Sequence, residues 1–337
     1  MKILCFLPNY IGDILMTTPA IRVIKRKIPY AEVLVVLKPE LKLLLEDNPN
    51  IDGMILKLSR YFVIKNVVNF KPDYVLLFRT TFFNSFVSFL SKPKFSVGVN
   101  EEMSSFLLSL TINKDITRPY RSECVMIVEK LFDFLKLDKK DMFSEVKKLD
   151  FYGIDFEEVK KSVEKKLLEL DIFDKKLIII SPCSSRETKM LTLKQYIALI
   201  SALIEKLNRD YYIVLVGALD NIEFINKILS SFRSERIVSL VGKTNLKELG
   251  YLFKLSSLVI TPDSGPAYIS EAVGAKTLIF FTSTLPQKYG PYPQNVRLVY
   301  SALSCSPCYK KKCKGIYCIK NFPIDRLIKV ALDFVMQ

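Results

Sequence analysis

Short apolar stretches alternate with longer segments of helical spacing along the chain. The apolar stretches are rich in aliphatic and β-branched residues, which is typical of strands. They lie at residues 3–7, 32–37, 53–57 and 73–78 in the first half, and at 176–181, 211–216, 236–240, 257–261, 276–281 and 296–300 in the second. This alternation predicts two α/β regions, each with a parallel sheet covered by helices on both faces.

The composition becomes strongly charged between residues 137 and 174, as in Asp138-Lys139-Lys140-Asp141. A charged stretch between two alternating regions indicates a domain junction. We therefore divide the chain into domains 1–160 and 161–337, which are of similar size.

Several helix boundaries are marked by capping residues. Thr192 with Gln195 forms a capping-box pattern, and Asn245 with Glu248 is a close variant. Pro19 is expected to kink the first helix or to restart it after Thr18.

An aromatic stripe follows the fourth strand, with Phe82, Phe86, Phe89 and Leu90 at helical spacing. Such a stripe usually packs into a core. Its position between Arg79 and the basic Lys92-Pro93-Lys94 also fits a helix lying on a membrane surface, so both interpretations stay open.

Three loops follow strands and precede helices, at residues 8–13, 182–189 and 262–265. Parallel sheets bind ligands at the carboxyl ends of their strands, so we expect these loops to line a cleft between the domains. In the third loop Asp263 and Ser264 are good N-caps, Gly265 admits a ligand close to the backbone, and Gly274 ends the following helix. Such a helix start suits a diphosphate, although an ordinary capped helix has the same pattern.

The composition limits which catalytic residues and which partners the chain can use. The chain has 337 residues, a net charge of +15 and no histidine. Triads, metal centres and general bases that depend on histidine are therefore excluded, and a carboxylate is the expected proton acceptor. The charge favours anionic partners. No zinc-finger, RRM-like or basic-zipper signature indicates nucleic acid, and no secretion signal or membrane-spanning run is evident.

The three loops together resemble glycosyltransferase family 9, the ADP-heptose:lipopolysaccharide heptosyltransferases. Pro8-Asn9-Tyr10-Ile11-Gly12-Asp13 is most similar to the heptosyltransferase II subgroup. The resemblance runs nearly end to end and includes Asp263-Ser264-Gly265-Pro266 and the run from Cys305 to Cys313. It implies the GT-B fold, in which two Rossmann-like domains with parallel sheets face an interdomain cleft. The N-terminal domain would then hold the acceptor, and the C-terminal domain the nucleotide sugar.

The resemblance also implies roles for particular residues. Asp13 would be the general base, and Lys189 would stabilise the departing diphosphate without a metal or other cofactor. Asp13 could instead cap the following helix, and Lys189 could be a surface lysine. The remaining expected substrate-binding residues are Gly12, Ser184, Ser185, Thr188, Glu223, Asp263, Ser264, Gly265 and Tyr268.

Two positions depart from the family's pattern. The family usually has histidine where this chain has Tyr268, and a tyrosine carries no positive charge near neutral pH. The basic residue and tryptophan that often follow the lysine are absent from Lys189-Met190-Leu191. Both departures bear on nucleotide affinity and on the identity of the donor.

Four cysteines lie close together in sequence, at Cys305, Cys308, Cys313 and Cys318. Their spacing is compatible with a structural metal, with a disulfide or with reduced thiols in a surface loop. The resemblance includes this run without implying a catalytic metal, and we assign no metal ligands.

The sequence therefore predicts an inverting transferase that moves heptose from ADP-heptose to an inner-core sugar of lipopolysaccharide. We expect it to be cytoplasmic and peripheral on an anionic inner-membrane surface, with no nucleic-acid partner. The alternatives are a related transferase with a different nucleotide sugar or acceptor, and a binding module that has lost catalysis.

Overall fold

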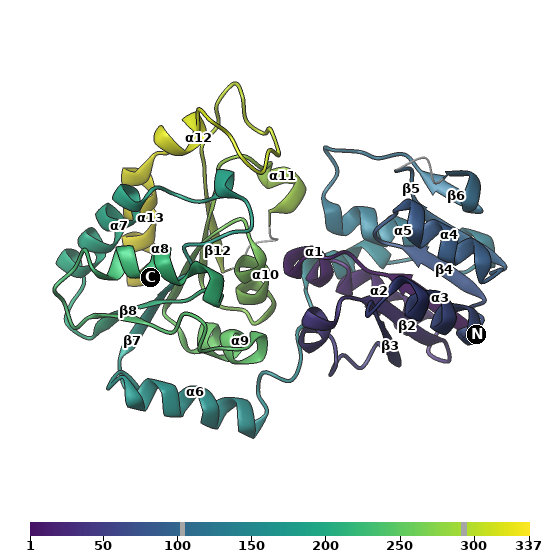
Figure 1. Ribbon diagram of the computed structural model, residues 1–337, viewed down its shortest axis with the longest axis horizontal. Coiled ribbons are helices and arrows are strands. Elements are labelled where there is room, and N and C mark those ends of the chain that lie inside the picture. The colour runs from purple at the N-terminus through teal and green to yellow at the C-terminus, as the bar shows by residue number, and fades with distance from the viewer. Residues whose placement is uncertain (102–104, 291–294) are drawn as a thin grey trace. The chain divides into compact units, whose positions relative to one another are not determined.

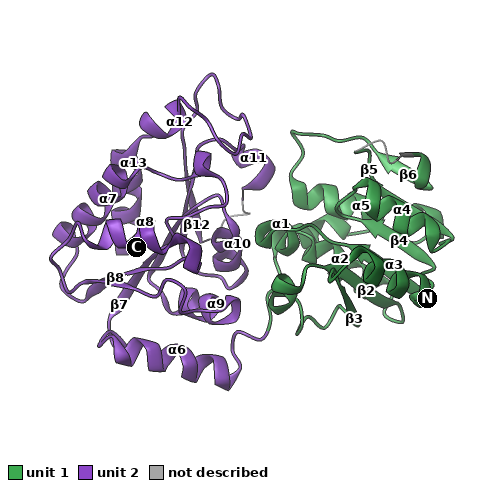
Figure 2. Ribbon diagram, viewed as in Figure 1, with its two compact units in different colours: residues 1–152 green, residues 153–337 purple. Residues whose placement is uncertain are grey.

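The computed structural model describes residues 1–101, 105–290 and 295–337 (Figure 1). The chain divides into two compact units, residues 1–152 and 153–337 (Figure 2). Each unit is built on its own parallel sheet, as the alternation of strands and helices predicts, and each sheet has six strands. The predicted α/β fold class is confirmed.

The first unit has the strand order β3-β2-β1-β4-β5-β6. β1 lies at the centre, where Ile3 pairs with Val33 on one side and with Tyr74 on the other. The strands are β1 (Lys2–Phe6), β2 (Glu32–Leu37), β3 (Gly53–Leu56), β4 (Tyr74–Leu77), β5 (Phe95–Val99) and β6 (Leu110–Ile112). The first four match predicted strands to within one or two residues, whereas β5 and β6 were not predicted.

Helices join these strands. They are α1 (Ile11–Leu15), α2 (Thr18–Lys27), α3 (Arg60–Phe70), α4 (Phe82–Leu90) and α5 (Tyr120–Leu135), with short 3-10 turns η1 (Pro39–Leu44), η2 (Ser105–Leu107) and η3 (Met142–Lys147). Pro19 lies in the first turn of α2, so the predicted restart is confirmed. Val63 and Val67 of α3 and Val87 of α4 pack with Leu4 and Phe6 of β1 in one core.

The second unit has the order β12-β11-β10-β7-β8-β9. Its strands are β7 (Lys176–Ile180), β8 (Tyr211–Leu215), β9 (Ile237–Ser239), β10 (Leu258–Pro262), β11 (Thr277–Phe281) and β12 (Val296–Tyr300). Its helices are α6 (Glu157–Glu169), α7 (Leu193–Lys206), α8 (Ile222–Leu229), α9 (Leu246–Leu255), α10 (Gly265–Ala272), α11 (Pro286–Tyr289), α12 (Tyr317–Lys320) and α13 (Ile324–Met336), with turns η4 (Glu187–Lys189) and η5 (Leu219–Asn221). Both predicted capping boxes are present, at the starts of α7 and α9.

The boundary between the units lies earlier than the predicted division after residue 160. That division falls within α6, which belongs to the second unit because it packs on α9. Lys166 Nζ lies 2.7 Å from Glu248 Oε1, and the Ser162 hydroxyl donates to the same oxygen. The charges of α6 are therefore part of its attachment to the second unit.

The aromatic stripe on α4 does not lie in the core. Phe82, Phe86, Phe89 and Leu90 are 52%, 38%, 57% and 36% exposed. The buried face of α4 instead carries small or polar side chains, namely Asn84, Ser85, Val87 and Ser88. The interpretation as core is wrong for the stripe, because helical periodicity shows which residues share a face but not which face is covered.

No helix in the described ranges is long and apolar enough to span a bilayer.

Candidate functional site

The centre of the second unit's sheet brings two predicted loops together. β7 and β10 are neighbours there, and the strand order runs in opposite directions on either side of them. Ligands of open α/β sheets bind at the carboxyl ends of strands at such a switch point. Lys189 ends the loop that follows β7, and Asp263 directly follows β10.

Lys189 and Asp263 form an ion pair at this point. Lys189 Nζ donates to Asp263 Oδ2 at 2.7 Å and to the Asp263 backbone carbonyl at 2.8 Å. The Lys189 side chain is 15% exposed and that of Asp263 is 3% exposed. Lys189 is therefore a positioned cation inside the fold and not a freely solvated surface lysine.

Two hydroxyl groups complete the surroundings of the Asp263 carboxylate. Thr284 donates to Oδ2 at 2.6 Å, and the Tyr268 hydroxyl lies 2.6 Å from Oδ1 and 3.0 Å from the carbonyl oxygen of Tyr289. A buried carboxylate needs such donors, because losing water is costly for a charge. Tyr268, at the position where the family usually has histidine, thus holds Asp263 in place. Thr284 was not predicted, since it follows β11 and joins the site only through the sheet order.

The helix start differs from the prediction in one respect. Ser264 is the N-cap of α10 but makes no side-chain capping hydrogen bond. The Asp263 carboxylate is engaged by Lys189, Thr284 and Tyr268. Ser264 therefore occupies the predicted N-cap position without a capping hydrogen bond, whereas Asp263 lies before the N-cap and its carboxylate has other partners. The first-turn N–H groups are not capped by Ser264, and Gly274, with a φ of +76°, follows the helix end as predicted.

The loop after β7 places its predicted residues in three environments. Ser185 is exposed, whereas Ser184 is partly buried and accepts from the Arg186 N–H at 3.3 Å. Thr188 is buried, donates to the Lys310 carbonyl and accepts from the Ser283 hydroxyl. The Thr188 hydroxyl thus ties this loop to the segment that carries the cysteines.

Glu223 lies in the first turn of α8 and is exposed. It follows β8, which is paired with β7, so it lies beyond the same edge of the sheet as Lys189. Its predicted contact with a ribose stays a prediction.

In the first unit, Gly12 and Asp13 lie in α1, just after the central strand β1. Gly12 is buried and Asp13 is partly buried in the first helical turn. The N-cap of α1 is Tyr10, so Asp13 is not the N-cap residue of this helix. β1 and β4 form the switch point of this sheet, which places Asp13 at the corresponding edge of the first unit.

Lys57 is a residue of this edge that sequence reasoning missed. Its Nζ donates to the Leu7 carbonyl and to Asn9 Oδ1, both at 3.2 Å, and so contacts the loop that leads to Asp13. Burial lowers the pKa of Lys57 to about 8, with the positive charges of Lys38 and Arg79 adding to the effect. No motif marked Lys57, because it meets the loop only through the pairing of β1, β2 and β3.

The four clustered cysteines are free thiols, of which Cys305 is exposed and Cys318 is buried. Burial raises the pKa of Cys318, and the nearby Cys308, Cys305 and Cys313 add to the shift. Backbone N–H groups of Ile316 and Gly315 lower the pKa of Cys313. Among the described residues no group of three or more cysteine, aspartate or glutamate side chains has the arrangement of a metal site.

Comparison with known proteins identifies the family. The sequence profile of glycosyltransferase family 9 (heptosyltransferase) matches residues 60–316, well over half of the chain. That range contains Lys189 and Asp263, whereas Asp13 precedes it.

Two curated proteins are similar over long stretches. Lipooligosaccharide heptosyltransferase 2 of Campylobacter jejuni is 26% identical over 99% of this chain and 98% of its own length. Lipopolysaccharide core heptosyltransferase OpsX of Haemophilus influenzae is 28% identical over 70% of this chain. The match spans 65% of the length of OpsX, slightly less than two thirds.

A solved structure shows the same fold. ADP-heptose LPS heptosyltransferase II of E. coli is similar with a TM-score of 0.78 and 17% identity, covering 100% of this chain and 99% of that one. The chain therefore has the GT-B architecture of two Rossmann-like domains, belongs to glycosyltransferase family 9, the heptosyltransferase family, and is a transferase enzyme.

Proposed function

We propose that the protein transfers heptose from ADP-heptose to an inner-core sugar of lipopolysaccharide, with inversion at the anomeric carbon. The observation that carries this proposal is the Lys189–Asp263 ion pair, which lies at the switch point of a nucleotide-binding fold in a chain of this family.

On the donor side, Lys189 and the start of α10 hold the diphosphate. An ammonium group has three N–H donors, and two of those of Lys189 go to Asp263. The third is directed to a diphosphate oxygen, while the N–H groups of Ser264 and Gly265 contribute the helix-start field. Asp263, Thr284 and Tyr268 position Lys189 without needing to touch the sugar.

On the acceptor side, Asp13 removes the proton from the attacking hydroxyl. The acceptor oxygen forms a bond to the anomeric carbon as the bond from that carbon to the diphosphate breaks. The bonding electrons leave with ADP, whose added negative charge Lys189 stabilises. The proton ends on the Asp13 carboxylate.

The other predicted contacts complete the proposal. Glu223 accepts from a ribose hydroxyl, Ser184 and Ser185 donate to the diphosphate, and Gly12 lets the acceptor approach Asp13. Thr188 and Tyr268 are both buried. Thr188 holds the loop after β7 in place, and Tyr268 holds Asp263 in place. No cofactor and no metal is assigned a role.

We also propose that the protein works on the cytoplasmic side of the inner membrane, attached to its anionic surface. The acceptor of the reaction is anchored in lipid, and the net charge of +15 favours an anionic surface.

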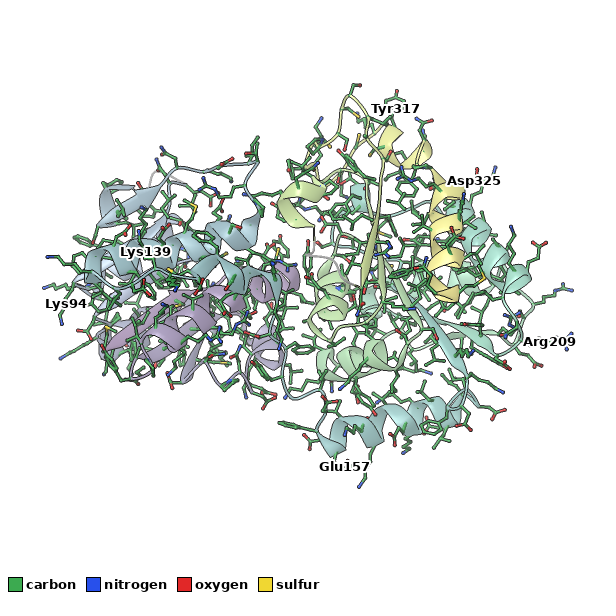
Figure 3. The ribbon with its side chains drawn as sticks, turned by 180° about the vertical axis from the view of Figure 1, so that it is seen from behind. Lys94, Lys139, Glu157, Arg209, Tyr317 and Asp325 are labelled. Carbon is green, nitrogen blue, oxygen red and sulfur yellow. The ribbon has the colours of Figure 1, made fainter. Side chains whose placement is uncertain are left out.

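The decisive experiment measures ADP release from ADP-heptose with a truncated, heptose-bearing lipopolysaccharide acceptor. Acceptor-dependent release by the wild type is expected, and Asp13→Asn should reduce turnover by roughly 10²-fold or more, because asparagine cannot take a proton. Asp325→Asn is the matched control, since Asp325 is an exposed carboxylate in the first turn of α13 (Figure 3).

Other outcomes identify the alternatives. Release with a different nucleotide sugar or acceptor would assign the protein to a related transferase. ADP binding without turnover on any acceptor would indicate a binding module, an alternative motivated by Tyr268 in place of the usual histidine. Equal turnover by Asp13→Asn and the wild type would remove Asp13 from the role of base.

A further inference from the structure

Helix α4 differs from an ordinary surface helix, because its exposed side is aromatic and its buried side carries polar residues. Its exposed side carries Phe82, Phe86, Phe89 and Leu90, and the rings of Phe82 and Phe86 are stacked with centroids 6.4 Å apart. Its buried side carries the hydroxyls of Ser85 and Ser88, for which no hydrogen-bond partner is found among the described residues. Both arrangements cost stability. The aromatic rings stay exposed to water instead of being buried, and the buried serine hydroxyls lose their hydrogen bonds to water.

Neighbouring elements extend this apolar side. α3 and η2 both pack against α4. Tyr61 at the start of α3 is 73% exposed, and Phe106 of η2 is 71% exposed. We call the exposed residues Tyr61, Phe82, Phe86, Phe89, Leu90 and Phe106 the aromatic face of the first unit. Apolar residues that are exposed on several elements packed together mark an interaction surface more often than single exposed residues do.

The chain around helices α3 and α4 of the aromatic face is strongly basic. Residues 53–100 contain seven basic side chains and one acidic one, Asp73, and neither α3 nor α4 contains an acidic residue. Lys65 and Lys92 are exposed, and the guanidinium of Arg60 lies 5.7 Å from the ring centroid of Phe83. Lys94 is also exposed and pairs with Asp73 at 2.8 Å.

We propose that the aromatic face is the surface by which the protein docks on an anionic phospholipid bilayer. An apolar helix side with lysines around it matches both layers of a bilayer surface, since the rings enter the acyl boundary and the lysines meet the head groups. A second copy of the chain fits less well, because it would bring the same positive charge against this one. The inference rests on the proposed function in one respect, namely that the acceptor of the reaction is anchored in lipid.

Vesicle flotation tests the apolar part of the proposal. The wild type should float with vesicles of phosphatidylethanolamine and phosphatidylglycerol, and much less with phosphatidylcholine alone. Phe82→Ser with Phe86→Ser should weaken binding at least about tenfold, because the variant lacks two rings that the bilayer would bury. The matched control is Phe143→Ser with Tyr317→Ser, two exposed aromatic positions elsewhere in the chain, and it should bind as the wild type does. Figure 3 labels Tyr317.

The basic part is tested separately. Lys65→Gln with Lys92→Gln should weaken binding about 5-fold for each lysine at low salt, and the difference should shrink as salt is added. Lys161→Gln with Lys165→Gln on α6 removes two exposed lysines far along the sequence from the aromatic face and should have little effect. If the double serine variant lost its fold, Phe89→Ser alone would provide the same test.

Transfer to a lipid-free core oligosaccharide separates this proposal from the proposed function. The serine variants should keep wild-type ADP release with that acceptor. Absence of release with every acceptor would contradict the proposed function but leave the vesicle result valid. The docking proposal fails if the wild type ignores anionic vesicles, if the serine variants bind equally well, or if sedimentation shows that the aromatic face instead joins two copies.

Discussion

Asp263 is the residue on which the donor side depends most. Its carboxylate is buried and receives hydrogen bonds from an ammonium and two hydroxyl groups. Such a carboxylate is satisfied only while these partners stay in place, and each partner belongs to a different segment of the second unit. The arrangement therefore links the position of the Lys189 cation to the packing of β10, β11 and α10.

The first prediction concerns Lys189. Lys189→Gln keeps a donor for Asp263 but removes the charge, so ADP affinity and turnover should both fall in titration calorimetry and in the ADP-release assay. Lys189→Ala should also lower the free energy of unfolding by about 3–5 kcal/mol, because it leaves Asp263 buried without its ion pair. Lys194→Gln, an exposed lysine in the first turn of α7, is the control. Unchanged ADP affinity in Lys189→Gln would contradict the assignment.

A second prediction follows from Lys57. Its pKa is lowered to about 8 in the folded protein, from an ordinary value near 10.5. Between these values the unfolded chain binds more protons at this residue than the folded one, so this contribution to stability increases as pH rises. The contribution of Lys57 to the free energy of unfolding is fully present above about pH 10.5 and is lost below about pH 8.

Urea unfolding from pH 7 to pH 10 measures this effect. Relative to Lys57→Gln, the wild type should gain stability as the pH rises through this window. Lys71→Gln, an exposed lysine, should show no such difference. A constant gap between wild type and Lys57→Gln would show that Lys57 titrates as an ordinary lysine.

At the scale of elements, the apolar stretches predicted most strands because buried parallel strands are runs of aliphatic and β-branched residues. β5 (Phe95–Val99) contains Ser96 and Gly98, and β6 (Leu110–Ile112) is only three residues long, so neither has that signature. Helix α4 shows a different limit. Its stripe was recognised correctly, but whether Phe82 and Phe86 face a core depends on the sheet and helices around them.

A third prediction concerns the segment of clustered cysteines. Cys313 should react first with limiting iodoacetamide near neutral pH, because hydrogen bonds from backbone N–H groups lower the pKa of its thiol. Cys318 should react later than Cys313, and Cys183 later than it too, since burial raises the pKa of both, that of Cys183 to about 11. Peptide mass spectrometry gives the order. Protection of all four clustered thiols would instead indicate a bound metal or disulfides, and metal analysis of protein purified without chelator would distinguish the two.

At the scale of the whole molecule, the resemblance of three loops to one family was sufficient to predict the fold and the family. It also selected Lys189 and Asp263, which the structure brings together at a switch point. Thr284 and Lys57 could not be selected in this way, because they meet those loops only through the order of strands in each sheet. Asp13, Glu223 and the two serines stay predictions until the variants are measured.

The separate sheets have a consequence for synthesis of the protein. All six strands of the first unit lie within residues 1–152, so this unit can fold while the ribosome is still translating residues 153–337. At typical elongation rates that interval lasts roughly 10–40 s. The second unit has no such opportunity, because Leu327, Ala331 and Phe334 of α13 belong to its core together with β7, and its folding is completed only after translation of α13. During that interval the nascent chain already exposes its aromatic face, so early contact with a bilayer or a chaperone would begin there.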